Sequence, residues 1–550
     1  MQRFVFTPHP QCLCVYWPRL NCPAAGRAVV HGPCIYHLGH VAVNDKMETN
    51  LGSMNARFNS RVSRIVVALV ALLAVNVFPA TRYVDLNSPS PTSPYLNWAT
   101  AATNIQDAIN VASPGDLVLV TNGVYQTGAT AIAPYLARSR VALTKALTVQ
   151  SVNGTAATII CGEKSTGAYG LGTSAIRCAY LTNGALLSGF TLTNGATQLS
   201  GDYPEDSGGA VYCESTAVVS NCVLINCSGY LGGGAFGGTL KNCMLTNNIA
   251  YFGGGGAMYS VLKNCSIIWS TCGWSGGGTY LCMATNCLYV DNLGLFGGAA
   301  FKGTLSQCTV VGNIAWHNSW GEGGYGGGVH SCTNYNSILY FNYSYAGGDN
   351  FTSESFTNCC TTPLPAGSGN FTNNPILYDE PFRNLRLGTN SPCINAGANT
   401  YVGGTVDLDG RVRIVGGTVD VGAYELQAGD FARFVPWLGQ NYLPTDGSGD
   451  YADADGDGAN NYQEWRADTI PTDPVSALRM IGATPGAGGA GISWESVNTR
   501  KYWLERRASL MASSPFAMIA TNIIGQTNTT LYADTNAGVG PFFYRVGVQK

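Results

Sequence analysis

An asparagine-and-cysteine motif recurs along the middle of the chain at a nearly constant interval, and it constrains the fold more than any other feature. Five cysteines of the motif are spaced by 21, 22, 22 and 21 residues: Cys222, Cys243, Cys265, Cys287 and Cys308. The equivalent positions Ser337 and Cys359 follow after 29 and 22 residues. A short apolar stretch comes after each mark, and a glycine cluster precedes the next one. A fixed period of this length predicts a solenoid in which each period is one coil.

The content of one period selects among the solenoid folds. A leucine-rich repeat would need a regular ladder of leucines and a helical segment in each turn, and the sequence has neither. Short apolar stretches between glycine and asparagine corners instead predict strands that wrap into a parallel β-helix, with coils about 4.8 Å apart. Glycine supplies positive φ at the corners, and asparagine tolerates left-handed geometry while bonding to the asparagine of the next coil. We therefore interpret the asparagine column as a structural ladder.

The cysteines in register predict an inward stack of unpaired thiols. Five cysteines at one coil position would face the interior, where a free thiol behaves as a small hydrophobic side chain. Disulfides are the alternative in an exported protein. The candidates for pairing are the adjacent Cys359 and Cys360 and the cysteines outside the register, Cys213, Cys227, Cys272, Cys282 and Cys332.

Charge and composition exclude several classes of protein. Charged residues make up 11% of the chain and the formal net charge is −3, so we expect no electrostatic attraction to nucleic acid or anionic membranes. Hydrophobic residues make up 45% of the chain, and 70 of its 550 residues are glycine. This balance does not suit disorder, and it does suit many short strands joined by tight turns.

An apolar run over 65–78, preceded by three arginines, predicts export. The run is shorter than the about 20 residues that a membrane span requires, so residues 54–80 are predicted to be a secretory signal peptide. Because export signals stand at the start of a chain, we interpret residues 1–53 as a misassigned extension, with translation beginning at Met47 or Met54. The protein is then extracytoplasmic, secreted or on a bacterial cell surface, and has no membrane span after cleavage.

Composition divides the exported part into three regions. Residues 81–425 carry the β-helix pattern and begin with a short amphipathic helix near 105–112, which would cover the open end of the solenoid. Residues 426–479 are predicted to be a linker with an EF-hand-like calcium loop. Residues 480–550 alternate apolar and polar positions, which predicts a small β-sandwich similar to a fibronectin type III module. The predicted fold class is all-β, a parallel β-helix solenoid with a small C-terminal β-sandwich.

Residues 81–425 resemble the pectate-lyase-like superfamily of right-handed β-helices. The opening segment 104–125, with NIQDA, GD and GVY, looks like the usual N-terminal entry of that superfamily. The closing segment 391–425, with SPCINAG, DLDG and DVGAYE, looks like that of bacterial surface β-helix proteins of the choice-of-anchor type. The glycine clusters followed by asparagine-ended strands are also similar to the repeats of chlamydial polymorphic outer-membrane proteins. The resemblance implies a right-handed fold and an extracytoplasmic compartment more than an activity.

The segment 453–464 matches a 12-position calcium-binding loop at every anchor, with aspartates at positions 1, 3 and 5, glycine at 6 and glutamate at 12. The predicted calcium ligands are Asp453, Asp455, Asp457, the carbonyl oxygen of Ala459, Asn461 (directly or through water) and Glu464. The alternative is a solvated acidic turn. The loop looks like a thrombospondin type 3 or dockerin-like repeat, but dockerins carry two such loops. We therefore expect calcium to stiffen the joint between the β-helix and the terminal module.

Two insertions interrupt the period, and loops on a rigid scaffold are where binding residues usually lie. The first, over 195–207, contains the candidate catalytic acids Asp202, Glu205 and Asp206. The second, over 314–325, contains the candidate acid Glu322 and the candidate sugar-binding residues Trp316, His317, Trp320 and Tyr325. The alternative is that these side chains only cover the coil. An acid of the first insertion facing Arg177 across a groove would favour an enzyme.

Two functions from different classes suit this sequence. The first is an exported, non-catalytic β-helix that binds polysaccharide, cell-surface glycans, matrix or other cells. The second is a polysaccharide lyase or glycoside hydrolase on the same scaffold, acting on an acidic, plant or algal polysaccharide. Such an enzyme needs acids and bases clustered on one lateral face, and the low charge of the coils favours the first function. The charged residues over 407–425 are interpreted as arginine–carboxylate pairs that finish the solenoid.

Overall fold

The computed structural model describes residues 79–199, 203–379, 384–486, 488–508, 516–537 and 541–549. The predicted extension 1–53 lies outside these residues, as does the predicted signal peptide 54–80 apart from its last two residues. Within the described part of the chain, no helix is both long enough and apolar enough to cross a membrane.

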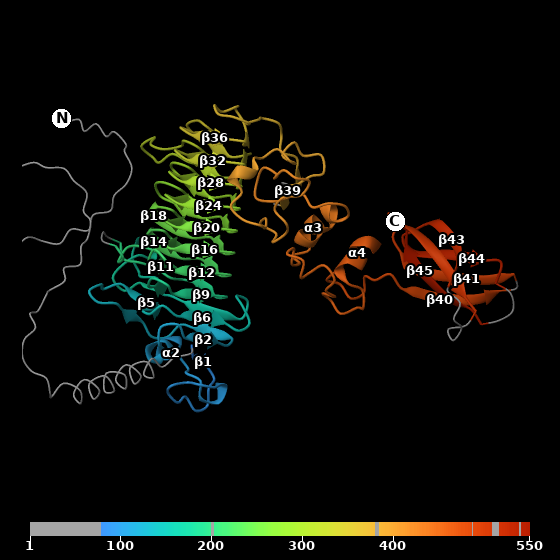
Figure 1. Cartoon of the computed structure of the whole chain (residues 1–550), viewed down its shortest axis with the longest axis horizontal. Helices are drawn as coiled ribbons and strands as arrows, with labels where there is room; N and C mark the ends of the chain where they lie inside the picture. Colours follow the sequence, from blue (N-terminus) through green and yellow to red (C-terminus); the bar gives the residue numbers. More distant parts are fainter. Residues whose placement is uncertain are drawn as a thin grey trace, which may run out of the picture. The chain divides into compact units, whose positions relative to one another are not determined.

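The chain between residues 81 and 361 forms a right-handed parallel β-helix, which confirms the predicted fold (Figure 1). Equivalent short strands of successive coils pair in parallel along four sheets, named here A to D. Sheet A contains β1 (Thr81–Val84), β2 (Leu117–Val120), β6 (Thr148–Ser151), β9 (Leu186–Ser188), β12 (Val218–Ser220), β16 (Thr239–Lys241), β20 (Val261–Lys263), β24 (Met283–Thr285), β28 (Thr304–Ser306), β32 (Thr333–Tyr335) and β36 (Ser355–Thr357). Sheet B contains β3 (Gly123–Tyr125), β7 (Thr158–Cys161), β10 (Thr191–Thr193), β13 (Val223–Ile225), β17 (Met244–Thr246), β21 (Ser266–Ile268), β25 (Leu288–Val290), β29 (Thr309–Val311), β33 (Ile338–Tyr340) and β37 (Cys360–Thr361).

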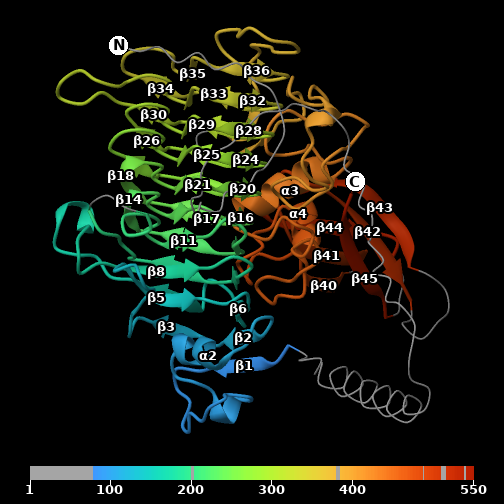
Figure 2. The same ribbon diagram turned by 60° about the vertical axis from the view of Figure 1, so that its left-hand side comes forward.

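Sheets C and D complete the coil, so that the chain runs from sheet A to B, then D, then C (Figure 2). Sheet C contains β4 (Thr130–Ala131), β5 (Arg138–Leu143), β8 (Ile176–Leu181), β11 (Val211–Cys213), β15 (Ala235–Phe236), β19 (Ala257–Met258), β23 (Thr279–Tyr280), β27 (Ala300–Phe301), β31 (Val329–His330) and β35 (Phe351–Thr352). Sheet D contains β14 (Ser228–Leu231), β18 (Ile249–Gly253), β22 (Thr271–Cys272), β26 (Leu293–Gly294), β30 (Ile314–Ala315) and β34 (Tyr343–Ser344). The pairing is parallel throughout except between β4 and β5.

The core is a stack of inward side chains that repeats from coil to coil. In sheet A, Leu240 pairs with Leu262, and both are fully buried. The cysteines of the repeat are buried at the corner between sheets A and B, and the described cysteines are all free thiols. Burial raises the pKa of Cys222, and it also raises the pKa of Cys265, Cys287 and Cys359, so these thiols stay neutral in the interior.

Two successive positions in the glycine clusters require glycine for different reasons. The first has positive φ, for example +64° at Gly254. The second has no such φ, but a Cβ at Gly255 would lie 2.3 Å from the carbonyl oxygen of Gly277 in the next coil. The same close approach holds for the whole column of second glycines, which is Gly209, Gly233, Gly255, Gly277, Gly298 and Gly327. In the last coil, where no further coil follows, this position is Asp349.

The asparagines form several ladders rather than one. Residues in the left-handed region line the corner between sheets A and B, where Asn221 and Asn242 are exposed and Asn286, Gln307 and Asn336 are buried. The whole of this corner column is Asn221, Asn242, Asn264, Asn286, Gln307, Asn336 and Asn358. A second ladder lies inside the coils after sheet B, where Asn292 donates from Nδ2 to Oδ1 of Asn313 at 2.9 Å, and Asn313 donates to Asn342 at 2.9 Å. Asn226 and Asn247 lie one position before the inner ladder, and both are exposed residues in the left-handed region.

Both ends of the solenoid are covered. At the N-terminal end, α2 (Ile105–Val111) packs on β1, β2 and β5 with buried Ile105 and Ile109, as the sequence predicts (Figure 1). Its buried Gln106 accepts the N–H of Ala142 at 2.7 Å and donates to its carbonyl oxygen at 3.2 Å. At the other end, Phe371 forms a backbone bridge with Cys360 and lies on the last coil. Two short 3₁₀ helices, η1 (Trp98–Thr100) and η2 (Ala168–Gly170), lie in loops.

After the last coil the chain turns back along the corner between sheets A and B. It passes through β38 (Leu377–Asp379), β39 (Asn384–Leu387) and η3 (Asn399–Tyr401). Residues 391–425, named here the return segment, bind the solenoid through the corner column. Two charged residues of 407–425 pair with partners outside that segment, Asp409 with Arg386 at 2.6 Å and Arg411 with Asp450 at 2.6 Å, while Arg413 and Glu425 lie 4.0 Å apart within it.

The remainder of the chain contains two helices and two small sheets. Helix α3 (Phe431–Gln440) lies in the stretch that the sequence presents as a linker, and it buries Phe434, Val435 and Leu438. Helix α4 (Asn461–Ala467) follows the acidic loop. The C-terminal module has two antiparallel sheets around a core that includes Trp494 and Tyr502. Its strands are β40 (Met480–Gly486), β41 (Gly489–Ser496), β42 (Lys501–Arg507), β43 (Ala517–Ile524), β44 (Asn528–Asp534) and β45 (Phe543–Val548).

Candidate functional site

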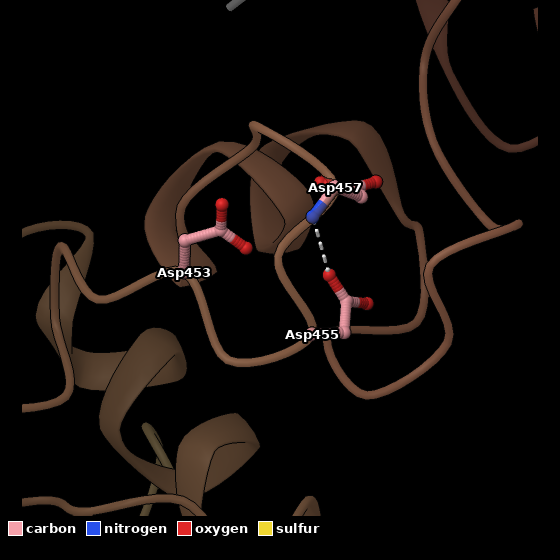
Figure 3. A group of neighbouring side chains, drawn as sticks. All are labelled: Asp453, Asp455 and Asp457. Carbon is pink, nitrogen blue, oxygen red and sulfur yellow. Dashed lines mark hydrogen bonds between the residues drawn. The ribbon is translucent and has the colours of Figure 1, made fainter.

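The acidic loop brings its three aspartates to one point. One carboxylate oxygen from each of Asp453, Asp455 and Asp457 lies within 4.8 Å of the others (Figure 3). Backbone N–H groups turn the loop by donating to these side chains, for example from Gly456 to Asp453 Oδ1 at 2.8 Å. Figure 3 shows the further bond from the N–H of Asp457 to Asp455. Three like charges this close repel one another, so the arrangement favours a bound cation.

Four buried oxygens of the predicted ligands accept no hydrogen bond: Asp455 Oδ2, Asp457 Oδ2, Asn461 Oδ1 and Glu464 Oε2. Of these, Asp457 Oδ2 forms an ion pair at 3.6 Å with the guanidinium of Arg479. Glu464 is fully buried at the start of α4, and the amide nitrogen of Asn461 is anchored to the carbonyl oxygen of Gly449 at 2.7 Å. Buried polar atoms nearly always have a partner, so these oxygens fit the hard-oxygen ligand set that calcium takes.

We expect the calcium affinity of this loop to fall as the pH is lowered from about 8 to about 6. In the metal-free protein, burial and the charges of Asp455 and Asp457 raise the pKa of Glu464 to about 7. Protons therefore compete with calcium for this carboxylate below that pKa, and binding releases protons. Because the folded-state pKa lies above the ordinary value, the metal-free fold also loses stability as the pH rises through 7.

Calcium titration calorimetry at several pH values checks this expectation, with two buffers of different ionisation enthalpy to count the released protons. A calcium affinity that does not change over this pH range would contradict it.

The described residues of the first insertion are anchored to the rest of the chain through Arg177 and Leu136. Arg177 of sheet C is 1% exposed, donates to the carbonyl oxygen of Pro204 and lies 5.6 Å from the ring centre of Tyr212. Burial lowers its pKa to about 10, and the charges of Glu205 and Asp206, two of the candidate acids, oppose this shift because they lie close to the guanidinium. Glu205 accepts the N–H of Leu136 at 3.0 Å. Asp206 is 2% exposed, and Asp202 lies outside the described residues.

The second insertion does not gather its candidates into one site. Trp320 is 84% exposed, while Trp316 is half-buried. The carboxylate of Glu322 accepts from the side chain of Asn318 at 2.9 Å, within its own turn. His317 packs edge-on against Tyr345, with ring centres 5.4 Å apart.

One of these candidates, Tyr325, belongs to a larger feature that sequence reasoning missed. Five aromatic side chains, one per coil, stand next to the glycine clusters in a line that we name the aromatic row: Tyr230, Phe252, Trp274, Phe296 and Tyr325. Their successive ring centres are 6.1, 6.3, 6.0 and 6.3 Å apart. The side chains of Phe252, Trp274 and Tyr325 are 40%, 39% and 43% exposed. A signal was present, since these residues recur at 22, 22, 22 and 29 residues.

The row rests on a second line of aromatic and apolar side chains. On the outer face of sheet C, Phe236, Met258 and Tyr280 pair in register along successive strands. Phe236 and Met258 are buried. Phe296 of the aromatic row has its ring centre 6.3 Å from that of Phe301, the next member of this line. An exposed row on such a support is a rigid apolar surface, and contiguous apolar surfaces commonly mark interaction sites.

Fold and loop together define the protein as a right-handed parallel β-helix with an acidic loop suited to a metal ion. No family model matches the chain, and no curated protein matches it. Solved structures that are similar to it include a pectate lyase, Pel9A, at 15% identity and a TM-score of 0.41, covering 64% of this chain and 97% of that one. A rhamnogalacturonan lyase has 13% identity and a TM-score of 0.33, covering 57% and 95%. A pectin methylesterase from carrot has 11% identity and a TM-score of 0.31, covering 52% and 89%.

Proposed function

We propose that this protein is an exported, calcium-stabilised β-helix that binds glycans without cleaving them. The observation that carries the proposal is the aromatic row. Exposed rings held one per coil on a rigid support offer apolar contact to the C–H faces of sugars. Successive ring centres lie 6.0 to 6.3 Å apart along the row, so the rings can contact successive stretches of one extended polysaccharide chain.

The positions of the candidate acids support binding over cleavage. Glu205 is held by Leu136, and Glu322 bonds within its own turn. General acid–base catalysis needs such groups positioned together around a substrate. Retention of the protein on a panel of insoluble polysaccharides, with and without a chelator, tests the proposal. Unsaturated products that absorb in the ultraviolet, or new reducing ends, would contradict the non-catalytic function.

Replacing Trp274 by alanine is expected to weaken glycan binding by roughly five- to tenfold, the effect of losing one aromatic contact worth about 1 kcal/mol. Trp269→Ala is the matched control. Trp269 is 59% exposed but lies outside the row, where its ring N–H donates to Asp291 at 3.3 Å. Depletion isotherms on the polysaccharide that retains the native protein compare the two variants. Equal losses in both would show that the row is not the binding surface.

A further inference from the structure

A cleft of about 580 Å³ lies between the solenoid and the return segment, on a different corner of the coil from the aromatic row. Its solenoid wall contains Asn221, Asn242 and Asn264 of the corner column. The opposite wall contains Arg386 and Asp446. The volume falls within the range of ligand-binding clefts, and the walls are more polar than those of most such sites.

Three residues higher in the corner column, named here the upper rungs, show what such side chains bind: Asn286, Gln307 and Asn336. Asn336 donates from Nδ2 to the carbonyl oxygen of Ala398 at 2.9 Å and accepts the N–H of Ala398 at Oδ1 at 2.8 Å. Asn286 donates to the carbonyl oxygen of Val406 at 2.7 Å. Gln307 accepts a backbone N–H of the return segment at 3.1 Å. Asn286, Gln307 and Asn336 therefore each bind a backbone amide of the return segment.

The lower rungs, which are Asn221, Asn242 and Asn264, carry the same side-chain amides but bind no backbone amide of the return segment. Asn264 accepts from Asn286 at 3.3 Å, and Asn242 donates to Asn221 at 3.2 Å. Among the described residues, none accepts a hydrogen bond from Nδ2 of Asn264 and none donates one to Oδ1 of Asn242. One free amide donor and one free acceptor thus stand on adjacent rungs of the cleft wall.

The charges of the cleft disfavour an acidic ligand. The guanidinium of Arg386 is neutralised by Asp409 at 2.6 Å and lies 4.9 Å from the ring centre of Tyr424. Hydrogen bonds from Ser448 hold the pKa of Asp446 below its ordinary value, so this carboxylate is charged at neutral pH. The lining residues therefore carry one more negative charge than positive charge and offer no unpaired cation to uronate or sulfate groups. Lys241 and Lys263, which precede Asn242 and Asn264 on sheet A, are not among the lining residues.

We propose that this cleft binds an N-acetylated sugar of a neutral glycan, whose acetamido group pairs with Asn264 and Asn242. The inference rests on the proposed glycan-binding function and names its ligand. An acetamido group offers the N–H and C=O that the upper rungs receive from the backbone. A peptide bond offers the same two groups, so the choice of a sugar rests on the proposed glycan binding, and a peptide ligand is an outcome of the test below.

Two β-1,4-linked hexasaccharides that differ in their acetamido groups, chitohexaose and cellohexaose, test the inference with the whole protein. We expect chitohexaose to bind about tenfold more tightly, the factor expected for two additional neutral hydrogen bonds. Asn264→Asp should abolish this preference, because it removes the Nδ2 donor of the amide. The substitution keeps the oxygen that accepts from Asn286, and aspartate also tolerates the φ of +52° at this position.

The matched control is Asn226→Asp. Asn226 also has a left-handed φ, +58°, and accepts from the next coil, from Asn247 at 2.7 Å, but it lies outside the cleft. Should Asn264→Asp fold poorly, Met244→Arg fills the cleft from an exposed position, and Met283→Arg is its control on sheet A. We expect Met244→Arg, and neither control, to abolish the preference for chitohexaose.

Hydrogen exchange locates the bound sugar. Protection of residues 242–246 and 443–447 by chitohexaose would support the inference. Equal affinity for both hexasaccharides, or protection confined to the aromatic row, would overturn it while leaving glycan binding intact. Binding of an acetylated alanine–glycine peptide in place of chitohexaose would overturn it in favour of a peptide site. Failure of all oligosaccharides and polysaccharides to bind would overturn both proposals.

Discussion

Gly255→Ala is expected to lower the free energy of unfolding of the solenoid by about 3 kcal/mol or more, the upper range for forcing an added methyl into a packed interior. The new Cβ would lie 2.3 Å from the carbonyl oxygen of Gly277 and 2.5 Å from that of Thr271. Both oxygens belong to the backbone of the neighbouring coil, so no side chain can move aside. Urea unfolding followed by circular dichroism measures the loss.

The control is Gly404→Ala, in the return segment. Its φ is outside the left-handed region, and the nearest atom to its added Cβ, a carbonyl oxygen of Val406, is 3.9 Å away. This variant is expected to unfold within about 0.5 kcal/mol of the native protein, as substitutions away from special sites usually do. Two variants of equal stability would mean that the coils can separate to admit the methyl group.

Glu464→Gln is expected to weaken calcium binding by about 100-fold. The loss of a residue that only supports a metal ligand already weakens binding by up to about 100-fold, and the loss of a ligand should cost at least as much. The native protein should gain about 2.7 kcal/mol of stability at free calcium of 100 times its dissociation constant, and the variant should gain almost none at the same concentration. Trp465 in α4 is the natural probe, because its ring centre lies 5.4 Å from that of Phe434 in α3. Its fluorescence and the thermal midpoint report binding and stability together.

Glu322→Gln provides the matched control, since it neutralises an exposed carboxylate far from the loop in sequence. It should leave the calcium titration unchanged. If chelation does not lower the thermal midpoint of the native protein, and if Trp465 does not respond to calcium, the acidic loop is a solvated turn and not a metal site.

The solenoid could be predicted from the sequence because every coil has the same types of residue at equivalent positions. The spacing of the cysteines, the apolar stretches and the corner asparagines are local marks of one coil, so the period and the fold could be derived without any tertiary information. The positive φ of Gly254 was predictable for the same reason. The task of Gly255 was not, because it depends on a carbonyl oxygen of another coil. Asp349, where no coil follows, supports that explanation.

Other features could not be predicted because they depend on segments far apart in the chain. The cleft exists only where residues beyond 380 pack against the corner column. No repeated pattern in the sequence indicates that these residues turn back along the solenoid. Helix α3 was missed because Pro436 lies inside it and polar, glycine-containing segments flank it. The aromatic row has the same period as the cysteines, but the step of 29 residues before Tyr325 makes that residue resemble part of the insertion and not a member of a repeat.

The covered ends of the solenoid bear on how the protein behaves in concentrated solution. Parallel coils stacked in register are geometrically close to the cross-β spine of a fibril, and an open last coil would be a template for another copy. Helix α2 occupies one end and the backbone around Phe371 the other. The two covers therefore limit the length of the stack to the coils of one chain. Duplication of whole coils could lengthen the solenoid without causing polymerisation, provided that both covers are kept.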